Sequence, residues 1–211
     1  MANPSISQLA QWARFSEPRC GHTKLILIDG QAGAGKSTLA NRLAIALGGS
    51  PSAGAGTYRP DAPLAASAPV QLLHGDDLYE GWAGLATLDE VLLEGILEPL
   101  AEGEQGAFQM WDWVEGRRTH LIRVPQREFL IVEGVGVGTP RARELAVLTV
   151  FVEAPWATRL TRGVERDHHS YDDVVERWTA FERDEQERHE TTGARAAADF
   201  IVDGTTAITD K

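Results

Sequence analysis

Cysteine, positive charge and long apolar runs are scarce in this chain, and each scarcity excludes a class of protein. Cys20 is the only cysteine among 211 residues, which excludes an internal disulfide and a zinc site built from cysteines, and favours a reducing, cytoplasmic setting. Acidic residues outnumber lysine and arginine by 31 to 20, and the net charge of −11 argues against a nucleic-acid polymer as partner. No apolar run approaches the roughly 20 residues of a membrane span. The first residues also lack the basic and apolar regions of a signal peptide.

The length predicts a single domain over residues 1–211, with 43% hydrophobic and 24% charged residues, as in soluble globular proteins. Residues 1–20 contain a predicted leading helix. Residues 48–69 are rich in glycine, proline, alanine and serine, and we expect a flexible loop there.

A complete G-x-x-x-x-G-K-[ST] motif follows the apolar run at 25–28 and leads into a helix-compatible segment, as a phosphate-binding loop requires. Its glycines let successive N–H groups point at phosphate oxygens, and the following helix adds the positive end of its dipole. In such a loop Lys36 lies between the β- and γ-phosphates, and the Ser37 hydroxyl binds Mg²⁺. We therefore expect ATP and Mg²⁺ as cofactors. The predicted nucleotide-binding residues are Gly30, Gln31, Ala32, Gly33, Ala34, Gly35, Lys36, Ser37 and Thr38.

Apolar runs that alternate with amphipathic segments predict a doubly wound α/β fold. Five runs, at 25–29, 70–74, 129–132, 148–152 and 200–202, are expected to form the sheet, and their apolar character suits parallel strands buried on both faces. Helices are expected at 5–15, 35–47 and 87–100, the last opened by a capping box of Thr87 and Glu90. Segments 107–114 and 120–124 predict a hairpin.

Acidic residues follow all five predicted strands, and ligands bind beyond the carboxyl ends of the strands in such sheets. We expect several of these carboxylates to lie near the phosphates. They are Asp29, Asp76, Asp77, Glu133, Glu153 and Asp203.

Other large classes of phosphate-loop protein do not match. The chain has neither the N-K-x-D segment of GTP switches nor the L-S-G-G-Q signature of transport ATPases, and it is too short for a motor. A small-molecule kinase remains. Such an enzyme needs a carboxylate beside the metal, a carboxylate that receives the acceptor's proton, and cations over the transferring group.

A series of short segments follows the phosphate loop in a fixed order: D-D-L-Y at 76–79, W-D-W-V at 111–114, V-E-G-V at 132–135, R-L-T-R at 159–162, E-R-D at 165–167 and A-D-F-I-V at 198–202. Over residues 24–204 the series resembles the uridine kinase and phosphoribulokinase group of phosphate-loop kinases. The resemblance implies a three-layer kinase fold, with helices on both faces of the sheet and a small lid at 162–175.

The resemblance also implies residue roles. Asp76 matches the aspartate that activates the acceptor hydroxyl, and Glu133 matches a strand-end carboxylate near Mg²⁺, so the expected metal site comprises Ser37, Glu133 and Asp76. Arg162 and Arg166 match lid arginines that act with Lys36 and Asp76 in catalysis. The acceptor is expected to bind at Asp76, Tyr79, Trp111, Asp112 and Arg118, with Trp113 nearby.

Several alternatives stay open at this stage. Gly116 stands where pyrimidine nucleoside kinases have a base-reading histidine, and residues 168–173 lack additional lid arginines, which argues against uridine or cytidine as acceptor. The expected acceptor is a nucleoside-like or sugar-like small molecule. A nucleoside monophosphate kinase, similar to cytidylate kinases, would need Arg117, Arg118 or Arg123 in the pocket. A nucleotide-binding regulatory module without efficient transfer is the third interpretation.

Overall fold

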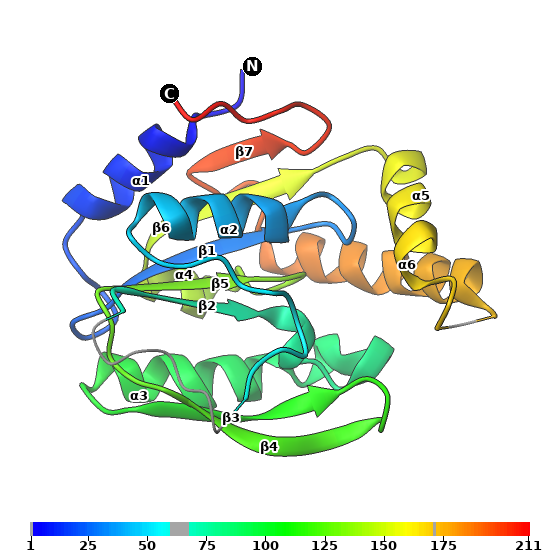
Figure 1. The fold of residues 1–211 in the computed structure, drawn as a ribbon, viewed down its shortest axis with the longest axis horizontal. Helices are drawn as coiled ribbons and strands as arrows, with labels where there is room; N and C mark the ends of the chain where they lie inside the picture. The colour runs from blue at the N-terminus through cyan, green and yellow to red at the C-terminus, as the bar shows by residue number, and fades with distance from the viewer. Residues whose placement is uncertain (1, 60–67, 171) are drawn as a thin grey trace.

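Five parallel strands in the order β2–β5–β1–β6–β7 form the centre of the molecule in the computed structural model, which describes residues 2–59, 68–170 and 172–211 (Figure 1). The strands are β1 (Lys24–Gly30), β2 (Val70–His74), β5 (Phe129–Glu133), β6 (Ala146–Glu153) and β7 (Phe200–Asp203). The sequence-based prediction of a doubly wound, five-stranded parallel sheet is confirmed.

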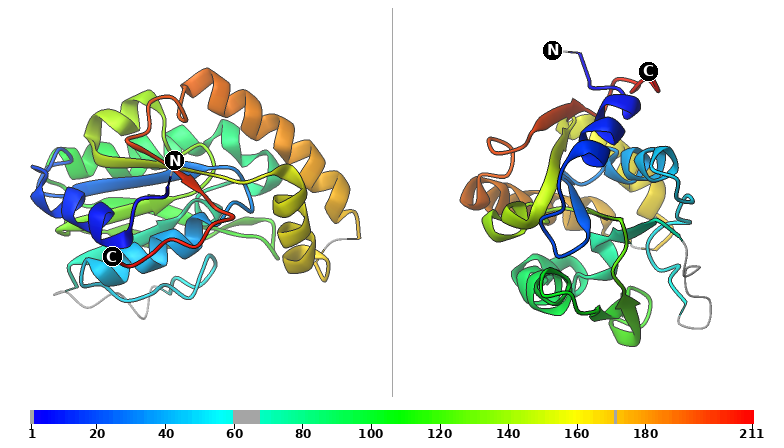
Figure 2. Two further views of the ribbon diagram at one scale, coloured as in Figure 1. Left: turned by 90° about the horizontal axis from the view of Figure 1, so that it is seen from above. Right: turned by 90° about the vertical axis from the view of Figure 1, so that its left-hand side faces the viewer.

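Alternating side chains of the strands build two separate cores. Leu25 and Leu27 of β1 point into one core, while Ile26 and Ile28 point into the other, because successive residues of a strand face opposite sides. Helices α1 (Ile6–Phe15) and α2 (Lys36–Ala46) cover the second core. Helices α4 (Pro140–Leu145) and α6 (Val174–Thr192) lie on the opposite face, and α5 (Trp156–Asp167) lies beyond the carboxyl end of β6 (Figures 1 and 2). The result is the expected three-layer architecture.

A hairpin and three short helical segments cover the edge of the sheet near β2. Strands β3 (Gly106–Asp112) and β4 (Arg117–Val124) form an antiparallel pair separate from the main sheet. The segments η1 (Gly75–Asp77), η2 (Gly81–Ala86) and η3 (Glu90–Leu97), followed by α3 (Glu98–Ala101), connect β2 to this hairpin. The predicted hairpin is therefore confirmed.

The helix predicted at 87–100 differs in its winding and in its start. Most of it is η3, a π-helix, and the N–H of Glu98 donates to the carbonyl O of Leu93, five residues back. The predicted capping box is wrong. The Thr87 hydroxyl donates to the carbonyl O of Gly84 in the preceding segment η2, instead of capping the helix that follows. No helix in the described ranges is both long and apolar enough to cross a bilayer.

The predicted loop at 48–69 lies partly outside the described residues, which omit 60–67. In its described part, the N–H of Ser52 donates to Oδ1 of Asn41 on α2 at 2.6 Å, and the carbonyl O of Tyr58 lies 3.0 Å from Nε2 of His120 on β4. The described part of the loop therefore contacts both α2 and the hairpin. The predicted lid at 162–175 covers the second half of α5, the connection to α6 and its first residues; position 171 is not described.

The two ends of the chain lie side by side (Figures 1 and 2). The Asn3 side chain donates to the carbonyl O of Asp203 at 2.9 Å and accepts from the Asp203 N–H at 2.8 Å. The N–H of Ile6 donates to the carbonyl O of Thr209 at 2.9 Å. These bonds hold the segment after β7 against the start of α1.

Candidate active site

The phosphate loop connects β1 to α2 and leaves an open mouth at the helix terminus. Gly35, which precedes α2, has a φ of +106°, and a Cβ atom built on it would have no heavy atom within 4 Å. The positive φ favours glycine, and the space lies where helix N–H groups attract anions. Gly30 is required for close packing instead, because its Cβ would lie 2.0 Å from the carbonyl O of Val152.

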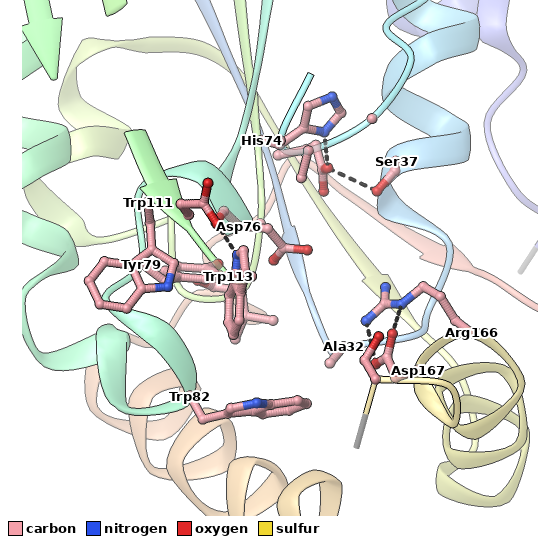
Figure 3. A pocket seen from close by; sticks show the side chains of 18 of the residues that line it. Ala32, Ser37, His74, Asp76, Tyr79, Trp82, Trp111, Trp113, Arg166 and Asp167 are labelled. Atoms are coloured by element: carbon pink, nitrogen blue, oxygen red, sulfur yellow. Dashed lines mark hydrogen bonds and ion pairs between the residues drawn. The ribbon is translucent and has the colours of Figure 1, made fainter. Parts of the chain in front are cut away.

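Lys36 and Ser37 join this loop to the end of a neighbouring strand. Lys36 is 7% exposed, and its Nζ donates to the carbonyl O of Gln31 at 2.9 Å. Oγ of Ser37 donates to Oε1 of Glu133, the last residue of β5, at 2.8 Å (Figure 3). The expected phosphate ligand, metal ligand and strand-end carboxylate therefore lie together.

His74 belongs to this cluster and was missed by sequence reasoning. Its Nδ1 lies 2.6 Å from Oε1 of Glu133, and its Nε2 lies 2.7 Å from Oγ of Ser52. Burial alone would lower the pKa of His74, but the hydrogen bond and charge of Glu133 raise it. Burial alone would raise the pKa of Glu133, but His74 and the Lys36 ammonium hold it below its ordinary value. The one sequence signal was a histidine at the predicted end of a strand.

Asp76 and Asp77 are adjacent in the sequence but have different surroundings. Asp76 lines the cavity described below, and its carbonyl O accepts a hydrogen bond from Nε1 of Trp113 at 2.8 Å. Burial and the Glu133 carboxylate raise the pKa of Asp76, against the opposing charges of nearby cations. Asp77 is 0% exposed, and its Oδ1 accepts from the N–H of Gly56 at 2.6 Å. The carboxylate available to a ligand is therefore that of Asp76.

A cavity of about 1040 Å³ extends from the phosphate loop to the β3–β4 hairpin, with Asp76 between them (Figure 3). One wall is aromatic. The ring centroid of Trp82 lies 5.9 Å from that of Trp113, 6.4 Å from that of Trp178 and 5.8 Å from that of Phe181, all in edge-to-face contact. These contacts connect η2, the hairpin and α6 into one aromatic surface that faces the cavity.

Three of the predicted acceptor residues, besides Asp76, line this cavity: Tyr79, Trp111 and Asp112. The Tyr79 hydroxyl donates to the carbonyl O of Val135 at 2.6 Å, and the residue is 2% exposed, so its hydroxyl is not available to a ligand. Oδ1 of Asp112 accepts from the N–H groups of Val114 and Glu115 and thereby shapes the hairpin turn.

Arg118, the remaining predicted acceptor residue, does not line the cavity. Its guanidinium donates to Oε1 of Glu80 at 3.0 Å and to the carbonyl oxygens of Gln109 and Leu78 at 2.7 and 3.0 Å. Neighbouring residues of a strand project to opposite sides. Arg117 therefore lines the cavity while Arg118 ties the hairpin to the segment after η1. The structure therefore gives Arg118 a structural contact, and its role in acceptor binding stays a prediction.

Both predicted lid arginines lie on α5, one turn apart, and line the cavity. The Arg162 guanidinium donates to the carbonyl oxygens of Gly33 and Gly204, each at 3.1 Å. The Arg166 guanidinium is 62% exposed and donates to both carboxylate oxygens of Asp167, at 2.7 and 3.0 Å. Asp167 also accepts from Nε1 of Trp178 at 3.0 Å. Trp178, a member of the aromatic wall, therefore positions the carboxylate that pairs with Arg166.

Three of the strand-end acids have structural contacts instead of lining the cavity. Asp29 accepts from the N–H groups of Gly136 and Gly138, at 2.7 and 2.8 Å, and so anchors the loop after β5. Glu153 pairs with Arg195 at 2.6 Å. Asp203 accepts from the N–H and hydroxyl of Thr205 and so caps its own turn. Of the six acids that the strand-end rule selects, Asp76 and Glu133 line the cavity.

Sequence reasoning also missed a buried ionic cluster beneath the phosphate loop. Arg159 is 1% exposed and lies between Glu182, at 2.7 Å, and Glu185, at 2.8 Å. The second carboxylate oxygen of Glu185 accepts from the N–H of Ala32 at 2.8 Å. Burial, and the hydrogen bond that protonated Glu185 donates to Glu182, raise the pKa of Glu185 to about 8. Burial alone would also raise the pKa of Glu182, but its bonds to Arg159 and Glu185 hold it low. The cluster fixes α5 and α6 to the loop.

This cluster predicts a pH-dependent stability. A pKa raised in the folded state means that the contribution of Glu185 is full below its unfolded pKa, near 4.5, and is lost as the pH rises through about 8. A tenfold change in an ionisation equilibrium corresponds to about 1.4 kcal/mol. Glu185→Gln cannot ionise, and its one amide oxygen keeps an acceptor for either Ala32 or Arg159. We therefore expect its Tm to fall less than that of the wild type between pH 5 and pH 9.

Glu182→Gln is the matched control, since the lowered pKa of Glu182 gives the opposite sign: its contribution is present above pH 4.5 and lost in acid. This variant should be less stable than the wild type at pH 7. Thermal unfolding at a series of pH values measures both. Parallel profiles for the wild type and Glu185→Gln would contradict the assignment.

A second hollow of about 520 Å³ lies beside the phosphate loop, on the side of β7. Gly35, Thr38 and Arg42 line it from the loop and α2, and Arg162 borders both this hollow and the cavity. Residues 204–208 form its outer wall. Thr38, a predicted nucleotide-binding residue, therefore faces a space continuous with the mouth of the loop.

The fold resembles that of solved kinases, although neither a scan against protein families nor a search of curated protein sequences gives a match. A provisionally assigned fructose transport system kinase from Silicibacter sp. TM1040 superposes with a TM-score of 0.59 at 21% identity, covering 94% of this chain and 98% of its own. A possible uridine kinase from Bacillus stearothermophilus gives a TM-score of 0.58 at 18% identity, covering 94% and 97%. This chain therefore has the α/β fold of phosphate-loop kinases, a five-stranded parallel sheet flanked by helices.

Proposed function

We propose that this chain is a Mg·ATP-dependent phosphotransferase that transfers the γ-phosphoryl group to a hydroxyl of a small molecule, nucleoside-like or sugar-like. One observation carries the proposal: Ser37 of the phosphate loop and Glu133 share a hydrogen bond in the same cavity that Asp76 lines from the acceptor side. A group held by the loop and an alcohol held against the aromatic wall would meet at Asp76 (Figure 3).

The residues present suit a nucleoside triphosphate. The free N–H groups at the start of α2 and the Lys36 ammonium supply donors for the phosphates. The second hollow, lined by Thr38 and Arg42, offers space for the base and ribose.

They also suit Mg²⁺. The described residues contain no cluster of three or more metal-binding acids, histidines or cysteines, but Mg²⁺ bound to phosphates keeps several waters and needs one or two protein ligands. Ser37 would bind the ion directly, and Glu133 would hold a metal-bound water. When bound, the ion neutralises charge on the β- and γ-phosphates.

Asp76 is suited to receive the acceptor's proton. Its raised pKa makes it a stronger base than an exposed carboxylate. As the acceptor oxygen bonds to the γ-phosphorus, the bond from that phosphorus to the ADP oxygen breaks, and the hydroxyl proton passes to Asp76. Trp113 fixes the backbone at Asp76 and so keeps its side chain in the cavity.

Arg166 is proposed to stabilise the transferring group. We expect Arg166→Met to lower kcat by about a hundredfold while changing the KM for ATP by less than about threefold. The reason is that the Arg166 guanidinium pairs with Asp167 in this structure and would bind the phosphoryl group only when charge develops on it. Steady-state kinetics measures the split. Arg183→Met, an exposed arginine on α6, is the control. Equal losses in kcat and in ATP affinity would argue against this role.

A screen for acceptor-dependent ADP release tests the proposal itself. Nucleosides, nucleoside monophosphates, sugars and pantothenate-like alcohols are supplied with Mg·ATP. Transfer to a hydroxyl supports the proposal, whereas transfer only to a phosphate would indicate a nucleoside monophosphate kinase. ATP binding that no acceptor turns into ADP release would indicate a regulatory module.

A further inference from the structure

Arg59 differs from the other arginines and the lysine that line the cavity. Lys36 donates to a backbone carbonyl oxygen, and so does Arg162. Arg117 pairs with Glu115, and Arg166 pairs with Asp167. The Arg59 side chain is exposed, and it has no hydrogen bond or ion pair to any of the described residues. Its charge is therefore available to a ligand.

The loop that carries Arg59 is tied down on several sides. Ser52 bonds to Asn41 and His74, Gly56 donates to Asp77, and the carbonyl O of Tyr58 lies 3.0 Å from Nε2 of His120. The last of these contacts is one residue from Arg59. The guanidinium is thus carried by an anchored backbone at the edge of the cavity, close to β4.

The acids on the same side of the cavity are already engaged. Glu115 pairs with Arg117, and Oδ1 of Asp112 accepts from two N–H groups of the hairpin turn. Lys36 and Arg162 border the phosphate loop, where the triphosphate would use their charge. The charge of Arg59 is therefore left for the acceptor.

We infer that the acceptor is an anionic alcohol whose carboxylate or phosphate group binds Arg59 while its hydroxyl reaches Asp76. Its carbon skeleton lies against Trp111 and Trp113, between the two polar ends of the cavity. An arginine suits both anions, because its planar donors match two oxygens of either group. This inference rests on the proposed function and narrows the class of its substrate.

Matched probes test it with the full chain. Ribose, riburonate and ribose 5-phosphate share one skeleton and differ in the group at C5; uridine, uridine 5′-carboxylate and uridine 5′-monophosphate form a second set. Binding is measured by calorimetry in the presence of Mg²⁺ and a non-hydrolysable ATP analogue, and turnover by ADP release. The carboxylate and phosphate arms distinguish the two anions.

We expect the anionic member of at least one set to bind about tenfold or more tighter than its neutral counterpart, as a charge-assisted hydrogen bond provides. Arg59→Met, which keeps the apolar stem, should abolish this preference, and Arg59→Lys should retain part of it. Arg123→Met, an exposed β4 arginine outside the cavity, should leave it unchanged. Affinity for the ATP analogue should stay within about twofold in every variant, since Arg59 lies on the acceptor side.

Two results would overturn the inference: anionic probes that bind no better than neutral ones, or an Arg59→Met variant that keeps the preference. Failure of the proposed function looks different. In that case anionic probes would bind through Arg59, but ADP release would not depend on them.

Discussion

Replacing Asp76 with asparagine is expected to lower kcat by about a thousandfold while the KM for ATP changes by less than about twofold, as expected for loss of a general base. Asparagine has nearly the same shape, and the bond from Trp113 to the backbone at position 76 does not involve the side chain. The variant therefore loses the proton acceptor and little else. Initial rates with a productive acceptor, together with calorimetric ATP binding, measure the two quantities.

The adjacent acid is the natural control. Asp77 is 0% exposed and bonds to Gly56, and asparagine can still accept that bond. Asp77→Asn should therefore keep activity within about tenfold of the wild type, with its main effect on the 52–59 loop. The opposite ranking of the two variants would assign the reaction to Asp77 and refute the site described here.

The second large effect is expected for Lys36→Met. Methionine replaces a buried stem of similar length but removes the ammonium at the mouth of the loop. We expect kcat to fall by about a hundredfold or more, because removing one preorganised cationic donor costs this much in a site that stabilises developing charge. ATP binding should weaken as well, which distinguishes this variant from Asp76→Asn.

Lys24→Met is the control for Lys36→Met, because it makes the same chemical change at a lysine outside the phosphate loop. Nζ of Lys24 donates to the carbonyl O of Arg14, at the opposite end of β1 from the phosphate loop. This variant should keep the ATP affinity and kcat of the wild type. If Lys36→Met bound ATP and turned over like Lys24→Met, the loop would not be a triphosphate site.

The sheet and the phosphate loop were predictable because their signals are local. Each strand is a short apolar run, and the loop is one contiguous motif followed by its own helix. Asp76 and Glu133 were predictable from the motifs around them, and the structure brings both to one cavity. The assignment of roles to them remains a prediction that the variants above would test.

Other members of the site depend on contacts between distant segments. His74 matters because β2 lies beside β5, so that it reaches Glu133, 59 residues later in the chain. Glu185 reaches the N–H of Ala32 across 153 residues. No local pattern encodes either distance. Arg117 lines the cavity and Arg118 does not, and which of these neighbours faces the cavity depends on how β4 pairs with β3. This pairing includes a register shift between Gln109 and Trp111, which the sequence does not reveal.

The joined ends of the chain bear on how the protein should be handled. The N-terminal segment braces residues 203–209, part of which borders the nucleotide-side hollow, so an attachment point is better placed away from these contacts. Cysteine labelling provides such a point. Cys20 is 0% exposed, so a cysteine introduced at the exposed Arg183 would be the accessible thiol for a fluorophore or for surface immobilisation. Binding assays on material attached in this way would leave the nucleotide side undisturbed.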